Sequence, residues 1–296
     1  MAEINVLKIL IDGLIRGGSY SLMALGLTLL YGVTRIVNMS HGSLFMLGVY
    51  IYYVFSTLIS GIDPFLALIM AIIFMGVFGA ILHRLAVHPI LGDDVAILVV
   101  TITIAVAVQA LVLMFFGGET ISIIDPIGLG YIEFLGLTLS GTSIMTLLLS
   151  LSLFAFIALF LNKAKIGKAM QAVSQDREAA MLMGINANRL YTLAMILSAI
   201  LASIAGFFYC LPIRMVGPSI WFSAITSAFA IVILGGLGSV KGSLIGSFVI
   251  GYAEITMREL ITEGGAIVPI APLSVMIVVL IVRPKGLFGK RVEMED

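Results

Sequence analysis

Nine long apolar stretches constrain what this chain can fold into. They lie at about residues 7–31, 42–60, 65–82, 95–116, 142–161, 190–210, 221–234, 244–257 and 266–282. Most reach the roughly 20 residues that an α-helix needs to cross a bilayer. With 61% hydrophobic and 11% charged residues, the chain lacks the polar surface that a water-soluble domain needs. We expect an all-α, polytopic transmembrane bundle of eight or nine spans, forming a single domain over residues 1–296.

Charge and cysteine content exclude several other classes. The formal net charge is zero, so nothing indicates nucleic-acid binding. The single cysteine, Cys210, cannot form an internal disulfide, and no Cys and His residues have metal-ligand spacing. We predict no catalytic residue, no metal and no cofactor. The first thirty residues lack a basic region and a small-residue cleavage site, so we expect them to stay as the first span.

One long polar segment, residues 163–189, lies between the fifth and sixth apolar stretches. Ser174 is expected to cap a short helix there, because its hydroxyl can accept a hydrogen bond from a free N–H group. Gly184 is expected to end this helix in the left-handed conformation. Roughly nine helical residues would then form a rod of about 13 Å. The alternative is a helix lying on the lipid surface, although such helices usually carry aromatic residues.

This short helix carries a compact surface of small and sulfur-containing side chains that suits a groove on a partner protein. Acidic residues near its start complement the positive end of the helix. The residues predicted to contact the partner are Arg177, Glu178, Ala179, Ala180, Met181 and Gly184.

The basic residues predict that residues 163–189 are cytoplasmic. If each apolar stretch crosses once, twelve of the sixteen Lys and Arg residues share that side, and only Lys8, Arg16, Arg214 and Arg258 lie opposite. Membrane proteins keep such an excess on the cytoplasmic side. We therefore expect nine crossings, an N-terminus outside and a cytoplasmic C-terminus. Eight crossings result if the seventh and eighth stretches form a re-entrant pair.

A glycine-rich run at residues 235–239 separates the two shortest apolar stretches, of about 14 residues each. Short, glycine-interrupted spans are typical of discontinuous helices. The run lacks the phosphate-loop spacing, since a glycine follows Lys241. We expect close helix contacts and a hinge between two conformations instead. The predicted hinge and packing residues are Asn38, His41, Gly42, Gly235, Gly236, Gly238, Gly242 and Gly246.

The sequence NMSHG at residues 38–42 precedes the second span. Asn38 or Ser40 is expected to cap the helix that follows, and Gly42 allows a neighbouring helix to approach closely. His41 is expected to fix this turn rather than bind a metal or carry protons, because no second ligand or acid accompanies it.

Polar residues within the spans are few. Asp12 and Arg16 are expected to pair on one helix face, and ionisable residues at membrane depth are candidates for function. No row of acidic residues occurs in the spans, which argues against ion-coupled transport. Neutral polar side chains would suit a zwitterionic or uncharged solute, although hydrogen bonds between helices are their commoner use. The candidates for the substrate path are Thr101, Thr103, Gln109, Thr226 and Ser227.

A second long segment, residues 117–141, is expected on the extracytoplasmic side. The sequences Asp125-Pro126 and Gly128 to Gly130 predict turns, so a small surface hairpin is expected. The segment contains three acidic residues and no basic one. It is either a solvated loop or a docking site for an extracytoplasmic partner.

Several segments together resemble the inner-membrane permeases of branched-chain amino acid ABC importers, and most closely the H-type subunit. The run Glu178-Ala179-Ala180, followed by Gly184, resembles the EAA loop that docks into the ATP-hydrolysing subunit in ABC permeases. The segments are GLTLLYGV at 26–33, NMSHG at 38–42, AVSQDREAAMLMGIN at 172–186, SAILASIAGFF at 198–208 and ILGGLGSVKGSLIGSFVIG at 233–251.

The resemblance implies a permease subunit, not itself an enzyme, that moves Leu, Ile, Val or related amino acids across the inner membrane by alternating access. It also implies an M-type permease partner, two cytoplasmic ATP-binding subunits, an extracytoplasmic solute-binding protein and surrounding membrane lipid. The alternatives are an ABC permease for urea, an amide or a sugar, an ion-coupled secondary transporter, and a receptor or scaffold without transport.

Overall fold

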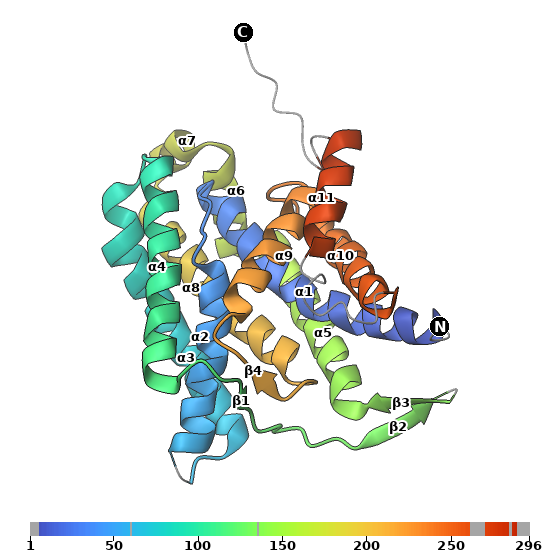
Figure 1. Ribbon diagram of the computed structural model, residues 1–296. Helices are drawn as coiled ribbons and strands as arrows, with labels where there is room; N and C mark the ends of the chain where they lie inside the picture. Colours follow the sequence, from blue (N-terminus) through green and yellow to red (C-terminus); the bar gives the residue numbers. More distant parts are fainter. Residues whose placement is uncertain (1–5, 60, 135, 261–269, 284–285, 289–296) are drawn as a thin grey trace.

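The computed structural model describes residues 6–59, 61–134, 136–260, 270–283 and 286–288, and these form a bundle of long helices (Figure 1). Each of the nine predicted apolar stretches contains a helix, which confirms the all-α class. Residues 266–269 of the last stretch lie outside the described part. The long helices are α1 (Val6–Thr34), α2 (His41–Tyr53), α3 (Pro64–Leu82), α4 (Asp94–Phe116), α5 (Gly141–Lys163), α8 (Ala187–Cys210), α9 (Ile220–Gly235), α10 (Val240–Leu260) and α11 (Ile270–Val282).

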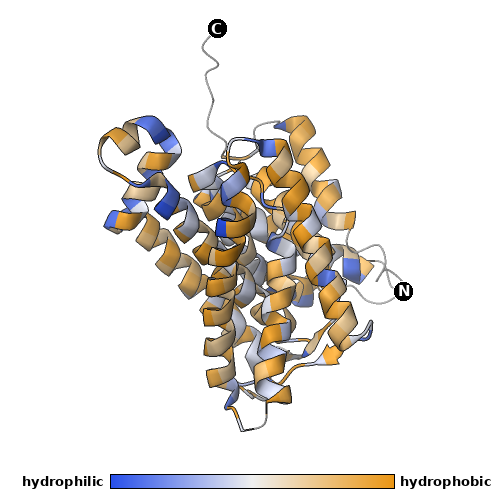
Figure 2. Cartoon of the chain, turned by 90° about the vertical axis from the view of Figure 1, so that its left-hand side faces the viewer, coloured by the Kyte–Doolittle hydropathy of each residue, from blue (hydrophilic) through white to orange (hydrophobic). Residues whose placement is uncertain are grey.

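Hydrophobic residues predominate along these helices, as the orange colour in Figure 2 shows. In the described part of the chain, five helical stretches are both long and apolar enough to cross a membrane, namely His41–Leu58, Pro64–Ile90, Asp94–Phe116, Gly141–Lys163 and Ala187–Cys210. α9 and α11 are apolar but shorter. α1 and α10 are long but carry charged residues. The number of crossings stays a prediction.

Local signals in the sequence set several helix ends. Asp63 caps α3 by accepting hydrogen bonds from the Phe65 and Leu66 N–H groups, with a proline in the first turn. Asp93 caps α4 in the same way through the Ala96 N–H. Two π-helical turns, η1 (Val54–Leu58) and η2 (His83–Val87), continue α2 and α3, and the 3-10 turn η3 (His88–Ile90) follows.

α1 lies at the centre of the bundle, packed on α10, α8 and α5. Glycines allow its backbone to approach α10 closely. A Cβ atom added to Gly251 of α10 would lie 2.7 Å from the backbone nitrogen of Gly17 and 2.9 Å from its Cα. Small residues at such crossings let the two backbones touch. In an apolar solvent this close packing holds helices together, because burying apolar side chains there gains little.

The glycine run at 235–239 forms the turn between α9 and α10, where Gly236 and Gly238 have φ angles of 96° and 80°. α10 has 21 residues, so the eighth stretch is longer than its apolar part suggested. Gly235 and Gly242 face each other across the turn without room for side chains. Gly246 lies against the Ile231 carbonyl, and Gly42 lies against Trp221 and Ile225 of α9.

Residues 117–141 contain the predicted hairpin, formed by β2 (Tyr131–Phe134) and β3 (Leu137–Ser140). β1 (Ile121–Ser122) pairs with β4 (Met215–Val216), which follows α8. These strands lie at the end of the bundle opposite α7 (Figure 1).

Asp125 holds this loop in place. Its carboxylate accepts hydrogen bonds from the Ile127 and Gly128 N–H groups and the Thr142 hydroxyl, and pairs with Arg214 at 2.9 Å. Burial alone would raise the pKa of this carboxyl, but the hydrogen bonds and Arg214 lower its pKa below the usual value. The group therefore stays ionised and keeps the loop attached to α5 and β4.

We predict that Gly251→Val lowers the free energy of unfolding in detergent by about 1–3 kcal/mol, because the new side chain overlaps the α1 backbone. Gly130→Ala is the matched control, since nothing lies within 4 Å of a Cβ atom at that position. Equal stability of the two variants would contradict the close α1–α10 contact.

Candidate functional site

The polar segment folds into two short helices, α6 (Lys165–Gln175) and α7 (Arg177–Leu182). The prediction that Ser174 caps the second helix is wrong, because Ser174 lies inside α6 and donates to the Gln171 carbonyl. Asp176 is the cap instead, and its carboxylate accepts from the Ala179 N–H at 2.9 Å. Since the chain is extended at Asp176, α7 has six residues rather than nine. Gly184 has the expected left-handed conformation, with φ of 82°.

α7 presents an apolar tip to its surroundings. Leu182 is 88% exposed and Met183 is 83% exposed, while Met181 is 44% exposed. Arg177, Glu178, Ala179 and Gly184 are also exposed.

Two contacts hold α7 to the rest of the bundle. Ala180, at 5% exposed, is the buried residue of α7. The Arg177 guanidinium lies 5.5 Å from the centroid of the Tyr191 ring on α8. The predicted contact residues therefore divide into an exposed set and one residue, Ala180, that packs inward.

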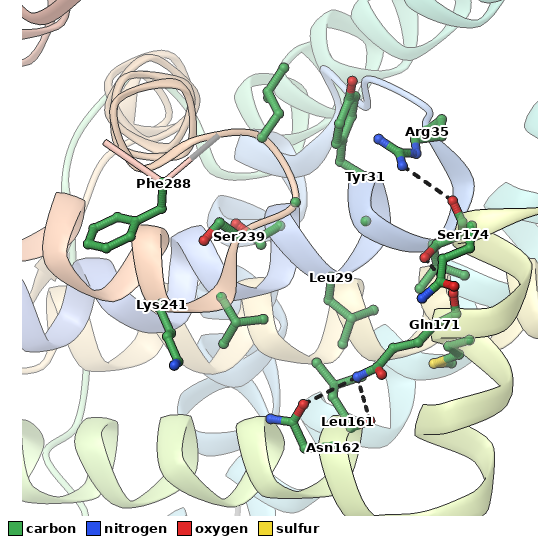
Figure 3. A pocket seen from close by; sticks show the side chains of 18 of the residues that line it. Leu29, Tyr31, Arg35, Leu161, Asn162, Gln171, Ser174, Ser239, Lys241 and Phe288 are labelled. Carbon is green, nitrogen blue, oxygen red and sulfur yellow. Dashed lines mark hydrogen bonds between the residues drawn. The ribbon is translucent and has the colours of Figure 1, made fainter. Parts of the chain in front are cut away.

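A cavity of about 690 Å³ lies near α6, between the end of α1, the α5–α6 junction and the α9–α10 turn. Figure 3 shows Ser239 and Lys241 on one side of it and Arg35, Ser174 and Gln171 on the other. The Gln171 side chain donates to the Leu161 carbonyl at 2.9 Å and to Asn162 at 3.3 Å. Of the predicted site residues, Gly238 alone lines this cavity.

The turn before α2 is fixed by Asn38 rather than by His41. The Asn38 side-chain oxygen accepts from the Ser40 N–H at 3.0 Å and from its hydroxyl at 2.6 Å. Ser40 occupies the N-cap position without a side-chain hydrogen bond of its own to the helix.

The fully buried His41 instead connects three helices. Its Nε2 atom lies 3.0 Å from the Met23 carbonyl of α1, and its Nδ1 atom lies 3.2 Å from the Ser198 hydroxyl of α8. His41 thus links α2 to both of its neighbours.

None of the candidates for the substrate path lines the cavity beside α6. Thr101 is buried and accepts from the Met39 N–H at 3.2 Å, so it links α4 to the turn before α2. Ser227 is buried and Thr226 half-buried on α9. Gln109 is half-buried on α4, and Thr103 is exposed, its hydroxyl donating to the Val99 carbonyl of its own helix. Their role in transport stays a prediction.

The sequence did not indicate a buried charged cluster on α1, α8 and α10. The expected Asp12–Arg16 pair is wrong, because Arg16 pairs with Glu254 of α10 at 2.7 Å. The Tyr20 hydroxyl also donates to Glu254, and the Arg16 guanidinium lies 4.2 Å from the Tyr209 ring centroid. Glu254 could have been noticed as an acid within an otherwise apolar part of α10. Its partner lies 238 positions away, so the pairing required the fold.

A family model described as branched-chain amino acid transport system / permease component matches residues 9–282. The chain belongs to this family. The resemblance seen in the sequence is therefore confirmed. The matched part contains all of the long helices except the first three residues of α1, so the family assignment covers the bundle.

Several known permease proteins match this chain over nearly its whole length. The high-affinity branched-chain amino acid transport system permease proteins BraD of Pseudomonas aeruginosa and LivH of Escherichia coli are each 28% identical, over 98% and 96% of both chains. The ribose import permease protein RbsC of Bacillus subtilis is 26% identical over 97% of this chain and 87% of its own. A chain in the structure of PsaBC from Streptococcus pneumoniae in complex with Fab gives a TM-score of 0.52 at 15% identity, over 94% of this chain and 92% of that chain. The structural match supports the fold.

We predict that Glu254→Leu in this permease costs about 3–5 kcal/mol of stability in detergent, because it leaves the Arg16 guanidinium buried without its partner. The double variant Arg16→Met, Glu254→Leu should lose less, since it leaves no buried charge. The control is Lys8→Met in the exposed Lys8–Glu259 pair on the same two helices, expected to cost less than about 1 kcal/mol. A double variant less stable than Glu254→Leu would contradict this account.

Proposed function

We propose that this chain is the permease subunit of an ABC importer for branched-chain amino acids, acting by alternating access in the bacterial-type inner (plasma) membrane. The observation that carries the proposal is the exposed tip of α7 in a chain that belongs to this permease family. A helix that exposes Leu182 and Met183 at its end is suited to seat in a groove on an ATP-binding subunit. Two such subunits, a second, M-type permease and an extracytoplasmic solute-binding protein would complete the complex.

The contacts of α7 suggest how ATP binding elsewhere moves the spans. α7 packs on α8 and α6, and α8 packs on α1, α2 and α3. A force on α7 would therefore reach the centre of the bundle through one helix. A partner shifts such an equilibrium only if it binds one permease conformation better than the other.

The proposed cargo follows the named relatives, whose similarity covers nearly all of this chain. A sugar is the second candidate, favoured by the similarity to the ribose import permease. Uptake of labelled leucine and, separately, of labelled ribose by cells expressing the whole complex separates the two. Uptake of ribose but not of leucine would favour the sugar.

We predict that Glu178→Lys or Gly184→Pro leaves the protein in the membrane but abolishes substrate-stimulated ATP hydrolysis by the assembled complex. The lysine reverses a charge on the exposed face of α7, and the proline cannot adopt the φ of 82° found at Gly184. Glu133→Lys on the exposed hairpin at the opposite end is the matched charge reversal and should leave hydrolysis unchanged. Normal hydrolysis in both α7 variants would contradict the coupling role.

The orientation can be tested by cysteine labelling, because the native Cys210 is buried. A maleimide that cannot cross membranes should label Gln175→Cys only after cells are permeabilised. It should label Glu133→Cys in intact cells. The reverse pattern would place α7 outside the cell and would contradict the proposed coupling to cytoplasmic ATPases.

A further inference from the structure

The cavity beside α6 has the charge pattern of an anion site. Arg35 and Lys241 stand on opposite walls (Figure 3), and among the described residues that line it none is Asp or Glu. The start of α10 also borders the cavity, and the positive end of its helix dipole favours negative charge. A ligand with a positive group, such as the ammonium of an amino acid, would find no carboxylate partner among these residues.

The floor of the cavity carries an unsatisfied donor. Thr28 of α1 is 1% exposed and lines the cavity, and its hydroxyl has no hydrogen-bond partner in the described part of the protein. Buried polar groups are normally satisfied, so this hydroxyl is an unpaired donor on a residue of the cavity wall. Leu29 and Val33, on the same helix, give the surrounding floor an apolar character.

Arg35 is held in an uncommon backbone conformation at the rim. Its φ angle is 58°, which residues other than glycine seldom adopt, and its guanidinium donates to the Ser174 carbonyl at 3.3 Å. Residues in such backbone conformations cluster at active sites and ligand-binding sites, where the surrounding structure holds them in place. Here the strain places a cation on the wall opposite Lys241.

We infer that this cavity binds the phosphate headgroup of an anionic phospholipid. The phosphate lies between Arg35 and Lys241, and an ester carbonyl of the glycerol accepts from the Thr28 hydroxyl. Thr28 is six residues before the end of α1, so it lies about 9 Å along the helix axis from the end that carries Arg35. Ester carbonyls lie below the phosphates in a bilayer, so cations above a buried donor match the order of groups along one lipid.

The lipid assignment uses the proposed orientation only to place the site in the inner leaflet, where basic pockets between transmembrane helices bind acidic headgroups. A free phosphate ion would satisfy the cations but would leave the Thr28 hydroxyl and the apolar floor unoccupied. The apolar floor therefore favours a lipid over an ion of the same charge.

Native mass spectrometry of the purified full-length chain tests the site, with phosphatidylglycerol, phosphatidylcholine and inorganic phosphate as the probes. We expect selective retention of phosphatidylglycerol. Arg35→Gln and Lys241→Gln should each lower that retention about fivefold, and Thr28→Val should lower it without changing the charge. Lys163→Gln is the matched control, because Lys163 is an exposed residue at the end of α5 that does not line the cavity.

Equal retention of the two lipids, or an equal loss in Lys163→Gln, would show general surface attraction and overturn the site. Displacement of the lipid by equimolar inorganic phosphate would show an anion site without lipid specificity and would also overturn it. Arg35→Lys, which keeps the charge, should retain binding and so excludes misfolding as the cause of a loss. Lipid retention is measured without transport, so failure of the proposed import function would leave this result unaffected.

Discussion

The close approach of α1 and α10 is the contact on which the rest of the bundle depends. Apolar helices gain little from burying apolar surface against one another in lipid, so backbone proximity and polar contacts must hold them. Gly251 supplies the proximity, and the Arg16–Glu254 pair supplies a charge contact in a place where both groups are largely removed from solvent. The rings of Tyr20 and Tyr209 stack on each other, and both lie beside the Arg16 guanidinium. This arrangement fixes the register of the central helix.

Around that fixed centre, α8 connects the regions proposed for coupling and for conformational change. Its first turns contact α7, where Tyr191 meets Arg177, and further along Ser198 meets His41 at the start of α2. Contacts along α8 therefore connect the tip of α7 to the start of α2. π-helical turns continue α2 and α3, and turns of this kind frequently occur at functional sites.

Most of the secondary structure and its local signals were predictable from the sequence. The apolar runs located the long helices. The hairpin expected within residues 117–141 is present, but its turn lies between Phe134 and Leu137 rather than at the turn residues 125–130. Gly184 ended α7 as expected, but the choice of Ser174 over Asp176 as cap was wrong. Both residues suit an N-cap, and only the extended backbone at Asp176 decides between them. The combination of motifs also identified the family.

The sequence by itself determined a helical membrane protein of one family, because length, hydropathy and capping residues act locally along the chain. Only the tertiary structure decided which helix faces meet. Helices such as α3 and α4 are apolar on all sides, so no amphipathic stripe marks their partners. The fold also decided that Arg16 pairs with Glu254 of α10 rather than with Asp12, four residues away on its own helix. The cavity at Arg35, Lys241 and Thr28 combines segments that are distant in the chain, and only the fold brings them together.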